Sequence, residues 1–117
     1  MKILIPPSEG KAKVQPSEIL FKDTNFQFAE YTQQIVDYLG LIEYEDLTSV
    51  YGTSQEKATM FHRQNQDVFN SKCVPAIKRY TGVVYNHIDW QSLSKKAQNY
   101  MNEHIIIFSG LFGLLTP

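Results

Sequence analysis

The chain has 117 residues, of which 43% are hydrophobic and 20% charged, with a formal net charge of −1. These values are typical of one soluble globular domain and give no overall attraction to nucleic acid or a membrane surface. No stretch reaches the roughly 18 consecutive apolar residues of a membrane span. The single cysteine, Cys73, excludes an internal disulfide and fits a reducing compartment. We therefore expect a cytoplasmic protein that occupies residues 1–117 as one domain and has no membrane partner.

The chain begins with a predicted strand over residues 2–5, which two prolines end. A polar stretch follows directly, and it contains Ser8, Glu9 and Lys11. Ligand sites in open α/β sheets commonly lie beyond the carboxyl ends of strands. These three residues are therefore candidates for a ligand-binding loop, and the alternative is a plain exposed turn.

Apolar residues at three- and four-residue spacing predict a helix over residues 28–41. A second helical pattern over residues 46–61 is interrupted at Tyr51-Gly52-Thr53-Ser54, which predicts two short helices joined by a tight turn. Such a turn would offer backbone amides, and the positive end of the second helix, to a DNA phosphate. An ordinary turn between two helices explains the same pattern.

Charge is distributed unevenly along the chain. Six acids and no Lys or Arg lie between residues 30 and 56, whereas five bases and one acid lie between residues 57 and 80. Two solvated faces of opposite sign would explain this. In the basic part, Arg79, Tyr80 and Tyr85 could form a surface for phosphate or for stacked bases, because cations interleaved with aromatic rings suit opened or single strands. The alternative for both tyrosines is a place in the core.

The last third of the chain predicts a strand over residues 82–85, entered through a glycine, and a helix that begins near Asp89 and runs to about residue 102. Ile105–Phe108 follows as four apolar residues in a row, which predicts a strand buried on both faces. The order of strands and helices predicts an α/β fold, with α+β as the alternative, in which helices flank a mixed sheet.

The apolar residues continue from that strand to the end of the chain. A buried strand with an apolar exit is an unusual end for a protein. We therefore expect the chain to be the front half of a longer protein. An exposed edge on the Ile105–Phe108 strand would predict pairing between copies, and so a homodimer.

Known catalytic and metal-binding signatures are missing from the sequence. It has no phosphate-binding glycine loop, no dinucleotide-binding fingerprint and no nucleophile elbow. The three histidines are far apart, and none has metal-ligand spacing with Cys73. We therefore expect no enzyme activity, no cofactor, no metal site and no direct handling of iron, and we expect Cys73 to be a buried structural residue.

Four segments together resemble the YaaA family of peroxide-stress proteins: Met1–Lys11, Leu47–Phe61, Pro75–Tyr85 and Ile106–Pro117. Their order and spacing match the family, so the resemblance covers the whole chain. Family members are about twice as long and continue into a second half with further basic residues.

The resemblance implies a bacterial cytoplasmic protein that limits oxidative damage driven by peroxide and free iron. It also implies DNA binding with little sequence specificity, through a positively charged cleft and a helix-hairpin-helix. Carried over to this sequence, the hairpin falls on Tyr51, Gly52, Thr53 and Ser54, with Lys57 on the following helix. The residues that we expect to contact DNA are therefore these five together with Arg63, Arg79 and Tyr80.

Overall fold

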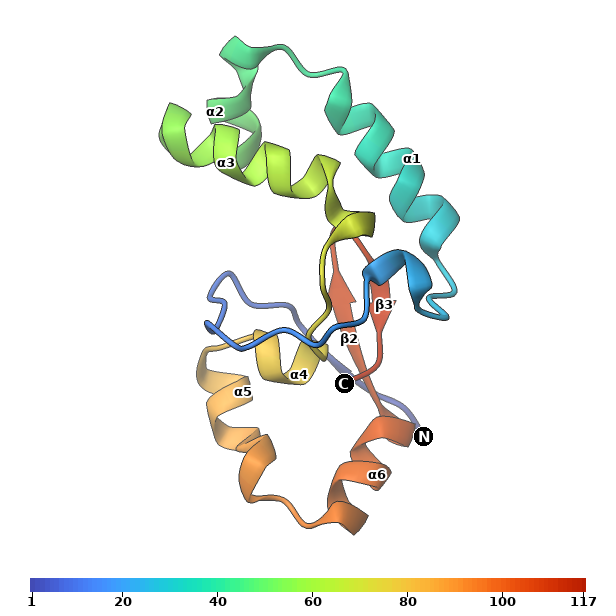
Figure 1. Cartoon of the computed structure of the whole chain (residues 1–117). Helices are drawn as coiled ribbons and strands as arrows, with labels where there is room; N and C mark the ends of the chain where they lie inside the picture. Colours follow the sequence, from blue (N-terminus) through green and yellow to red (C-terminus); the bar gives the residue numbers. More distant parts are fainter. The chain divides into compact units, whose positions relative to one another are not determined.

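The computed structural model describes all 117 residues, and the chain divides into two compact units (Figure 1). The first, which we call the sheet unit, contains Met1–Glu18 and Cys73–Pro117. The second, the helical unit, is Ile19–Lys72. Six α-helices and one three-stranded mixed sheet confirm the predicted α/β class. No helix combines the length and the apolar character that a membrane crossing requires.

The sheet contains β1 (Ile3–Ile5), β2 (Ile105–Ser109) and β3 (Gly113–Leu115), in the spatial order β1-β2-β3. β1 and β2 are parallel, whereas β2 and β3 form an antiparallel hairpin. The predicted exposed edge on the Ile105–Phe108 strand is therefore wrong, because β2 is the central strand and both its edges are paired. A homodimer stays a prediction, and strand pairing between copies would have to use β1 or β3.

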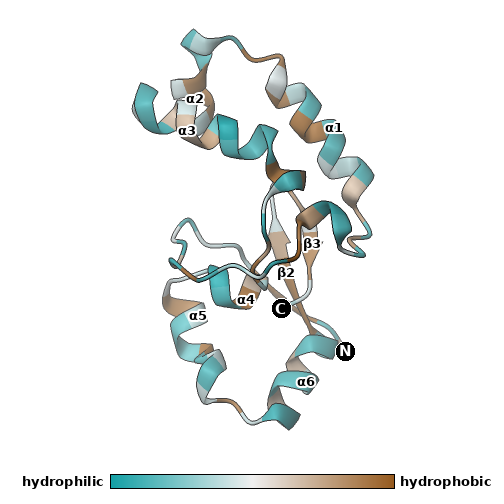
Figure 2. Cartoon of the chain, viewed as in Figure 1, coloured by the Kyte–Doolittle hydropathy of each residue, from teal (hydrophilic) through white to brown (hydrophobic).

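The core of the sheet unit covers one face of this sheet. Alternate residues of the strands point to that face, and Ile5, Ile105 and Ile107 are buried there against helical residues Ile77 and Tyr85. Figure 2 shows the strongly hydrophobic character of β2 and β3. On the other face Phe108 remains 42% exposed. The prediction that this strand is buried on both faces is therefore wrong, because the side-chain period of two sends alternate residues to a face with less cover.

Three helices complete the sheet unit: α4 (Ala76–Arg79), α5 (Val83–Ile88) and α6 (Lys95–His104). The predicted strand over residues 82–85 is instead the start of α5, which places Tyr85 and Ile88 against the same core. A 3₁₀ turn, Trp90–Ser92, separates α5 from α6. The last helix begins later than predicted because Ser94 is its N-cap, its Oγ accepting from the amide of Ala97 at 3.2 Å.

The helical unit consists of α1 (Ala29–Gly40), α2 (Leu47–Tyr51) and α3 (Gln55–Gln66), with 3₁₀ turns at Phe21–Asp23, Tyr44–Asp46 and Val68–Asn70. The structure confirms the predicted helix over residues 28–41 and the predicted pair of helices within 46–61. Leu47 and Ala58 are buried between α2 and α3. Gln66 ties α3 to α1 by donating to the carbonyl of Val36 at 2.9 Å.

Candidate functional site

Two of the segments singled out in the sequence pair with each other in the sheet unit. Lys11 and Tyr80 face one another across an antiparallel bridge, and two backbone hydrogen bonds flank it: Ala12 N–H to Arg79 O at 2.7 Å and Thr81 N–H to Gly10 O at 3.1 Å. We call this pairing of residues 8–12 with residues 79–82 the loop seam. The pairing places the segment with Ser8, Glu9 and Lys11 next to Arg79. A ligand site built from these four residues would need them to be close.

Side-chain contacts also join the two segments of the loop seam. The Lys11 ammonium donates to the backbone carbonyls of Ser8 and Glu9 and lies 4.4 Å from the centroid of the Tyr80 ring. The Arg79 guanidinium donates to the carbonyl of Ala12 at 2.5 Å. Burial lowers the pKa of Lys11 and the nearby Arg79 charge lowers it further, whereas Glu9 opposes both effects. The seam therefore holds two cations near one another beside one carboxylate.

A glycine makes this close approach possible. A Cβ at Gly10 would lie 2.3 Å from the Thr81 Oγ1, a distance that real Cβ atoms do not reach. Tyr85 fixes the same region from α5, because its hydroxyl donates to the carbonyl of Pro6 at 2.6 Å and its ring stacks on Tyr80 with centroids 5.3 Å apart. Tyr85 is therefore buried in the core, whereas Tyr80 is half-buried against it, and contact of Tyr80 with DNA stays a prediction.

The other predicted site is the α2–α3 hairpin, residues 47–66 of the helical unit. Gly52 ends α2 in the left-handed region, at φ 62° and ψ 33°, and a Cβ at this position would meet no atom within 4 Å. Ser54 caps α3, its Oγ accepting from the amide of Lys57 at 3.5 Å. The turn is therefore exposed, and the first-turn amides of a 12-residue helix begin directly after it.

Tyr51 holds the two helices of the hairpin together. Its hydroxyl accepts from the side-chain amide of Asn65 at 3.1 Å and lies 3.3 Å from Nδ1 of His62. Its ring packs against Phe61 at a centroid distance of 6.3 Å. The Tyr51 hydroxyl, one of the predicted DNA-contacting groups, is thus engaged in contacts within the hairpin.

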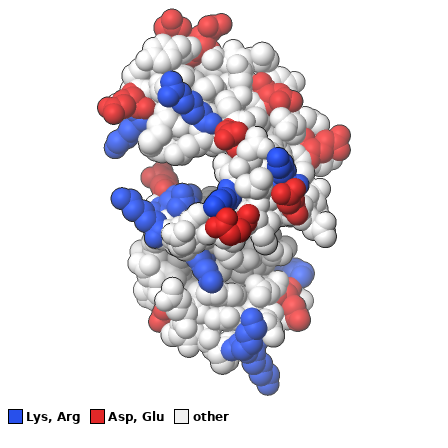
Figure 3. All heavy atoms as spheres, viewed as in Figure 1, with Lys and Arg blue, Asp and Glu red and all other residues white.

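The basic residues of α3 do not form a single stripe. Lys57 and Arg63 are exposed and six positions apart, which places them about 120° apart around the helix and about 9 Å apart along it. Figure 3 shows acidic side chains over the connection between α1 and α2 and both signs of charge along α3. The hairpin therefore presents Lys57 next to its turn, with Arg63 at the flank.

The predicted DNA-contacting residues fall in both units. Tyr51 to Arg63 belong to the helical unit, whereas Arg79 and Tyr80 belong to the sheet unit. The structure therefore brings the hairpin residues together in one unit and the seam residues together in the other. No group of three or more His, Cys, Asp or Glu side chains could hold a metal ion.

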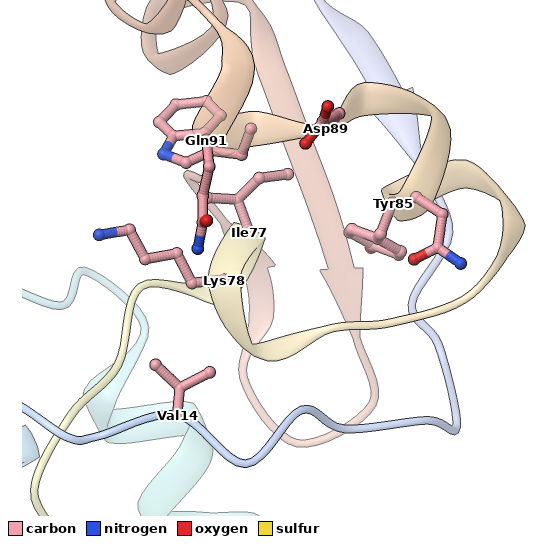
Figure 4. Close-up of a pocket in the computed structure, with 8 residues that line it drawn as sticks. Val14, Ile77, Lys78, Tyr85, Asp89 and Gln91 are labelled. Carbon is pink, nitrogen blue, oxygen red and sulfur yellow. The ribbon is translucent and has the colours of Figure 1, made fainter.

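A cavity of ≈ 290 Å³ in the sheet unit was not predicted from the sequence. We call it the Trp90 pocket, and eight residues line it: Val14, Ile77, Lys78, Tyr85, Asn86, Asp89, Trp90 and Gln91. Figure 4 shows Gln91 and Lys78 on one side of Ile77, with Asp89 and Tyr85 on the other. Seven of these residues come from α4, α5 and the segment after α5.

Comparison with protein-family models shows the family to which the chain belongs. The family model described as "Peroxide stress protein YaaA" matches residues 1–117. The chain belongs to this family. The segments that carry the YaaA resemblance now have positions in the fold, since Met1–Lys11 and Pro75–Tyr85 contribute the two sides of the loop seam.

Curated UPF0246 proteins are similar to this chain along nearly its whole length. A UPF0246 protein of Lachnoclostridium phytofermentans is 32% identical over 100% of this chain and 46% of its own length. A UPF0246 protein of Limosilactobacillus reuteri is 29% identical over 100% of this chain and 47% of its own length. One from Streptococcus pneumoniae is 32% identical over 98% of this chain and 46% of its own length. The chain thus spans about half the length of the curated relatives it matches.

Proposed function

We propose that this chain binds DNA with little sequence specificity through the α2–α3 hairpin, in the cytoplasm, and helps to protect DNA from peroxide and iron-driven damage. The observation that carries the proposal is the exposed left-handed turn at Gly52 directly before the N-terminus of α3. The family description, "Peroxide stress protein YaaA", supports the proposed role in protection from peroxide. The role is binding rather than catalysis, and the effect on iron damage is indirect.

The physical basis of binding is access to backbone amides. Without a Cβ at Gly52, a phosphate can approach the turn closely, and the free amides at the start of α3 carry a partial positive charge. Lys57 adds a full charge on the first turn, and Arg63 adds a second one at the flank. Contacts of this kind position a duplex without reading its bases, so little sequence preference is expected.

The test is fluorescence-anisotropy binding to two unrelated short duplexes and one branched DNA over a series of salt concentrations. The double variant Lys57→Ala/Arg63→Ala should lower the slope of log affinity against log salt by about 1.8, if each side chain neutralises one phosphate. The control is Lys95→Ala/Lys96→Ala on α6, which removes the same charge from the sheet unit and should keep the slope. An equal loss in both variants, or binding insensitive to salt, would contradict the proposal.

A second candidate function is an enzyme or small-molecule binder that uses Ser8, Glu9, Lys11 and Arg79. The observation that favours it is the loop seam, which brings these residues together from distant parts of the sequence. Thermal stabilisation by small anions, lost in Lys11→Gln and Arg79→Gln but kept in Lys57→Ala, would support this function. Equal stabilisation of all variants would exclude it.

A further inference from the structure

The Trp90 pocket is an open hollow lined by apolar and polar residues in equal number. Its apolar walls come from Val14 and Ile77 together with the rings of Tyr85 and Trp90. Ligand pockets combine such walls with a few polar groups that fix the orientation of the ligand. At ≈ 290 Å³ the hollow lies just below the size range of drug-sized ligand pockets, which suits a small ligand of one or two rings.

The aromatic walls are held in place by the fold. Tyr85 is buried, stacks on Tyr80 and is anchored by its hydrogen bond to the Pro6 carbonyl. Trp90 packs against the core of the sheet unit, and its carbonyl accepts from the side-chain amide of Gln98 at 3.0 Å. Rigid walls lose little entropy when a ligand binds, so a flat ring can stack on the partly exposed Trp90 at low cost, beside the buried Tyr85.

The polar side chains of the pocket are exposed and available to a ligand. The side chains of Lys78, Asn86, Asp89 and Gln91 line the cavity, whereas Gln98 and Ser92 nearby are hydrogen-bonded within the protein. The two amides can each donate and accept. Asp89 is placed by a left-handed backbone, φ 43°, which is the only positive φ outside the glycines.

Charge in the pocket indicates an uncharged ligand. Lys78 and Asp89 carry opposite charges, so neither an anion nor a cation gains a net attraction. Aromatic walls favour a planar ring, and the mixed donors and acceptors favour a heterocycle with both kinds of group on its edge.

We propose that the Trp90 pocket binds a nucleobase or nucleoside. Stacking on the aromatic walls supplies affinity for any base, as it does in single-strand binding proteins. Asn86, Gln91, Lys78 and Asp89 bond the ring edge. The proposal does not rest on DNA binding by the hairpin, which belongs to the other unit.

The chain carries its own reporter for this site, because Trp90 is its single tryptophan. Adenosine, guanosine, cytidine and thymidine are titrated separately against the full chain, with excitation at the red edge of the tryptophan band, where nucleosides do not absorb. At least one should change the emission in a saturable way. Ligand-observed NMR on the same samples detects binding that leaves the emission unchanged.

Variants then locate the binding. Gln91→Ala and Lys78→Ala each remove one hydrogen-bonding group and should weaken binding roughly two- to tenfold. Two matched controls should leave binding unchanged: Lys95→Ala and Lys96→Ala, two lysines of α6 that lie outside the pocket. All four residues are exposed, so each variant is expected to keep its fold, which circular dichroism checks.

Three outcomes would overturn the proposal. The first is no saturable response by either method with any nucleoside. The second is a response that is equal in the pocket variants and in the controls, since this would mean unspecific stacking. The third is saturation by a zwitterion such as phenylalanine with none by nucleosides, which would assign the pocket to another ligand class. A loss of DNA binding in the hairpin variant, with nucleoside binding kept, would separate the two proposals.

Discussion

The ammonium group of Lys11 lies over the ring of Tyr80, 4.4 Å from its centroid. A cation in this position is attracted by the electron-rich face of the ring. The contact joins the polar loop after β1 to the segment after α4, so the two segments contribute to one surface.

The pKa of Lys11 should respond to its charged neighbours. Burial and Arg79 lower this pKa, and Glu9 raises it. Arg79→Gln should therefore raise the pKa, and Glu9→Gln should lower it further. An NMR titration of the labelled lysine side chain measures both shifts, with Lys78→Gln as a control that removes a base outside these causes. If Arg79→Gln lowered the pKa of Lys11 and Glu9→Gln raised it, the seam would not form as described.

The lowered pKa of Lys11 also fixes the sign of a stability effect. Between the folded and the unfolded pKa of this lysine, the unfolded chain binds more protons than the folded one. The free energy of unfolding should therefore rise with pH across that interval, and this contribution should shrink in Arg79→Gln. Chemical denaturation at several alkaline pH values checks the difference between the two proteins.

Gly52 should be sensitive to any Cβ, although the space around it is empty. Gly52→Ala should lower the free energy of unfolding by about 1–2 kcal/mol, because an L-residue at φ 62° is strained. Gly52→Asn should cost less, since asparagine adopts this conformation more readily. Gly110→Ala is the control, as its Cβ also meets no atom within 4 Å but its φ is not in the left-handed region. Equal effects of Gly52→Ala and Gly110→Ala in thermal unfolding would refute the strain argument.

Neighbouring residues of β2 should differ strongly in their contribution to stability. Ile107 has 0% exposure, whereas Phe108 is 42% exposed on the other face. Ile107→Ala should cost about 2–5 kcal/mol and Phe108→Ala clearly less, despite the larger side chain removed. Where Ile107→Ala does not fold, Ile107→Val should still cost about 0.5–1.5 kcal/mol. A larger loss in Phe108→Ala would mean that the opposite face of the sheet is the buried one.

Cys73 should react slowly with alkylating reagents. It is half-buried, and burial raises the pKa of its thiol, so less thiolate is present at neutral pH than for an exposed cysteine. The alkylation rate of the folded chain should increase with pH over a more alkaline range than that of the denatured chain. Mass spectrometry of timed samples measures both rates, and identical pH profiles would contradict the effect of burial.

The sequence predicted best where a long periodic pattern and local turn chemistry agree. The helix over 28–41 and the break at Gly52 follow from residues close in sequence. Val83 and Val84 were misread as a strand because β-branched residues favour strands, whereas packing of Tyr85 and Ile88 against the core decides for a helix. Burial on one face of β2 depends on distant elements, which a run of four apolar residues does not specify.

The candidate sites also differ in whether nearby or distant residues form them. The hairpin was predictable because all its residues are local. The loop seam could be suspected only as two separate segments, since its pairing depends on where Lys11 and Tyr80 meet in space. The Trp90 pocket had no signal in the sequence, because Val14 completes a wall built by Ile77 and the residues around α5.

The helical unit is inserted into the sheet unit, because the chain leaves the sheet unit at Glu18 and returns to it at Cys73. Ser17 and Cys73 mark the place, since the amide of Ser17 donates to the carbonyl of Cys73 at 2.9 Å. During synthesis, the continuous helical unit can fold as soon as it emerges from the ribosome. β1 must wait for β2, which is made about 100 residues and roughly 5–20 seconds later. β1 is therefore made long before the strand with which it pairs.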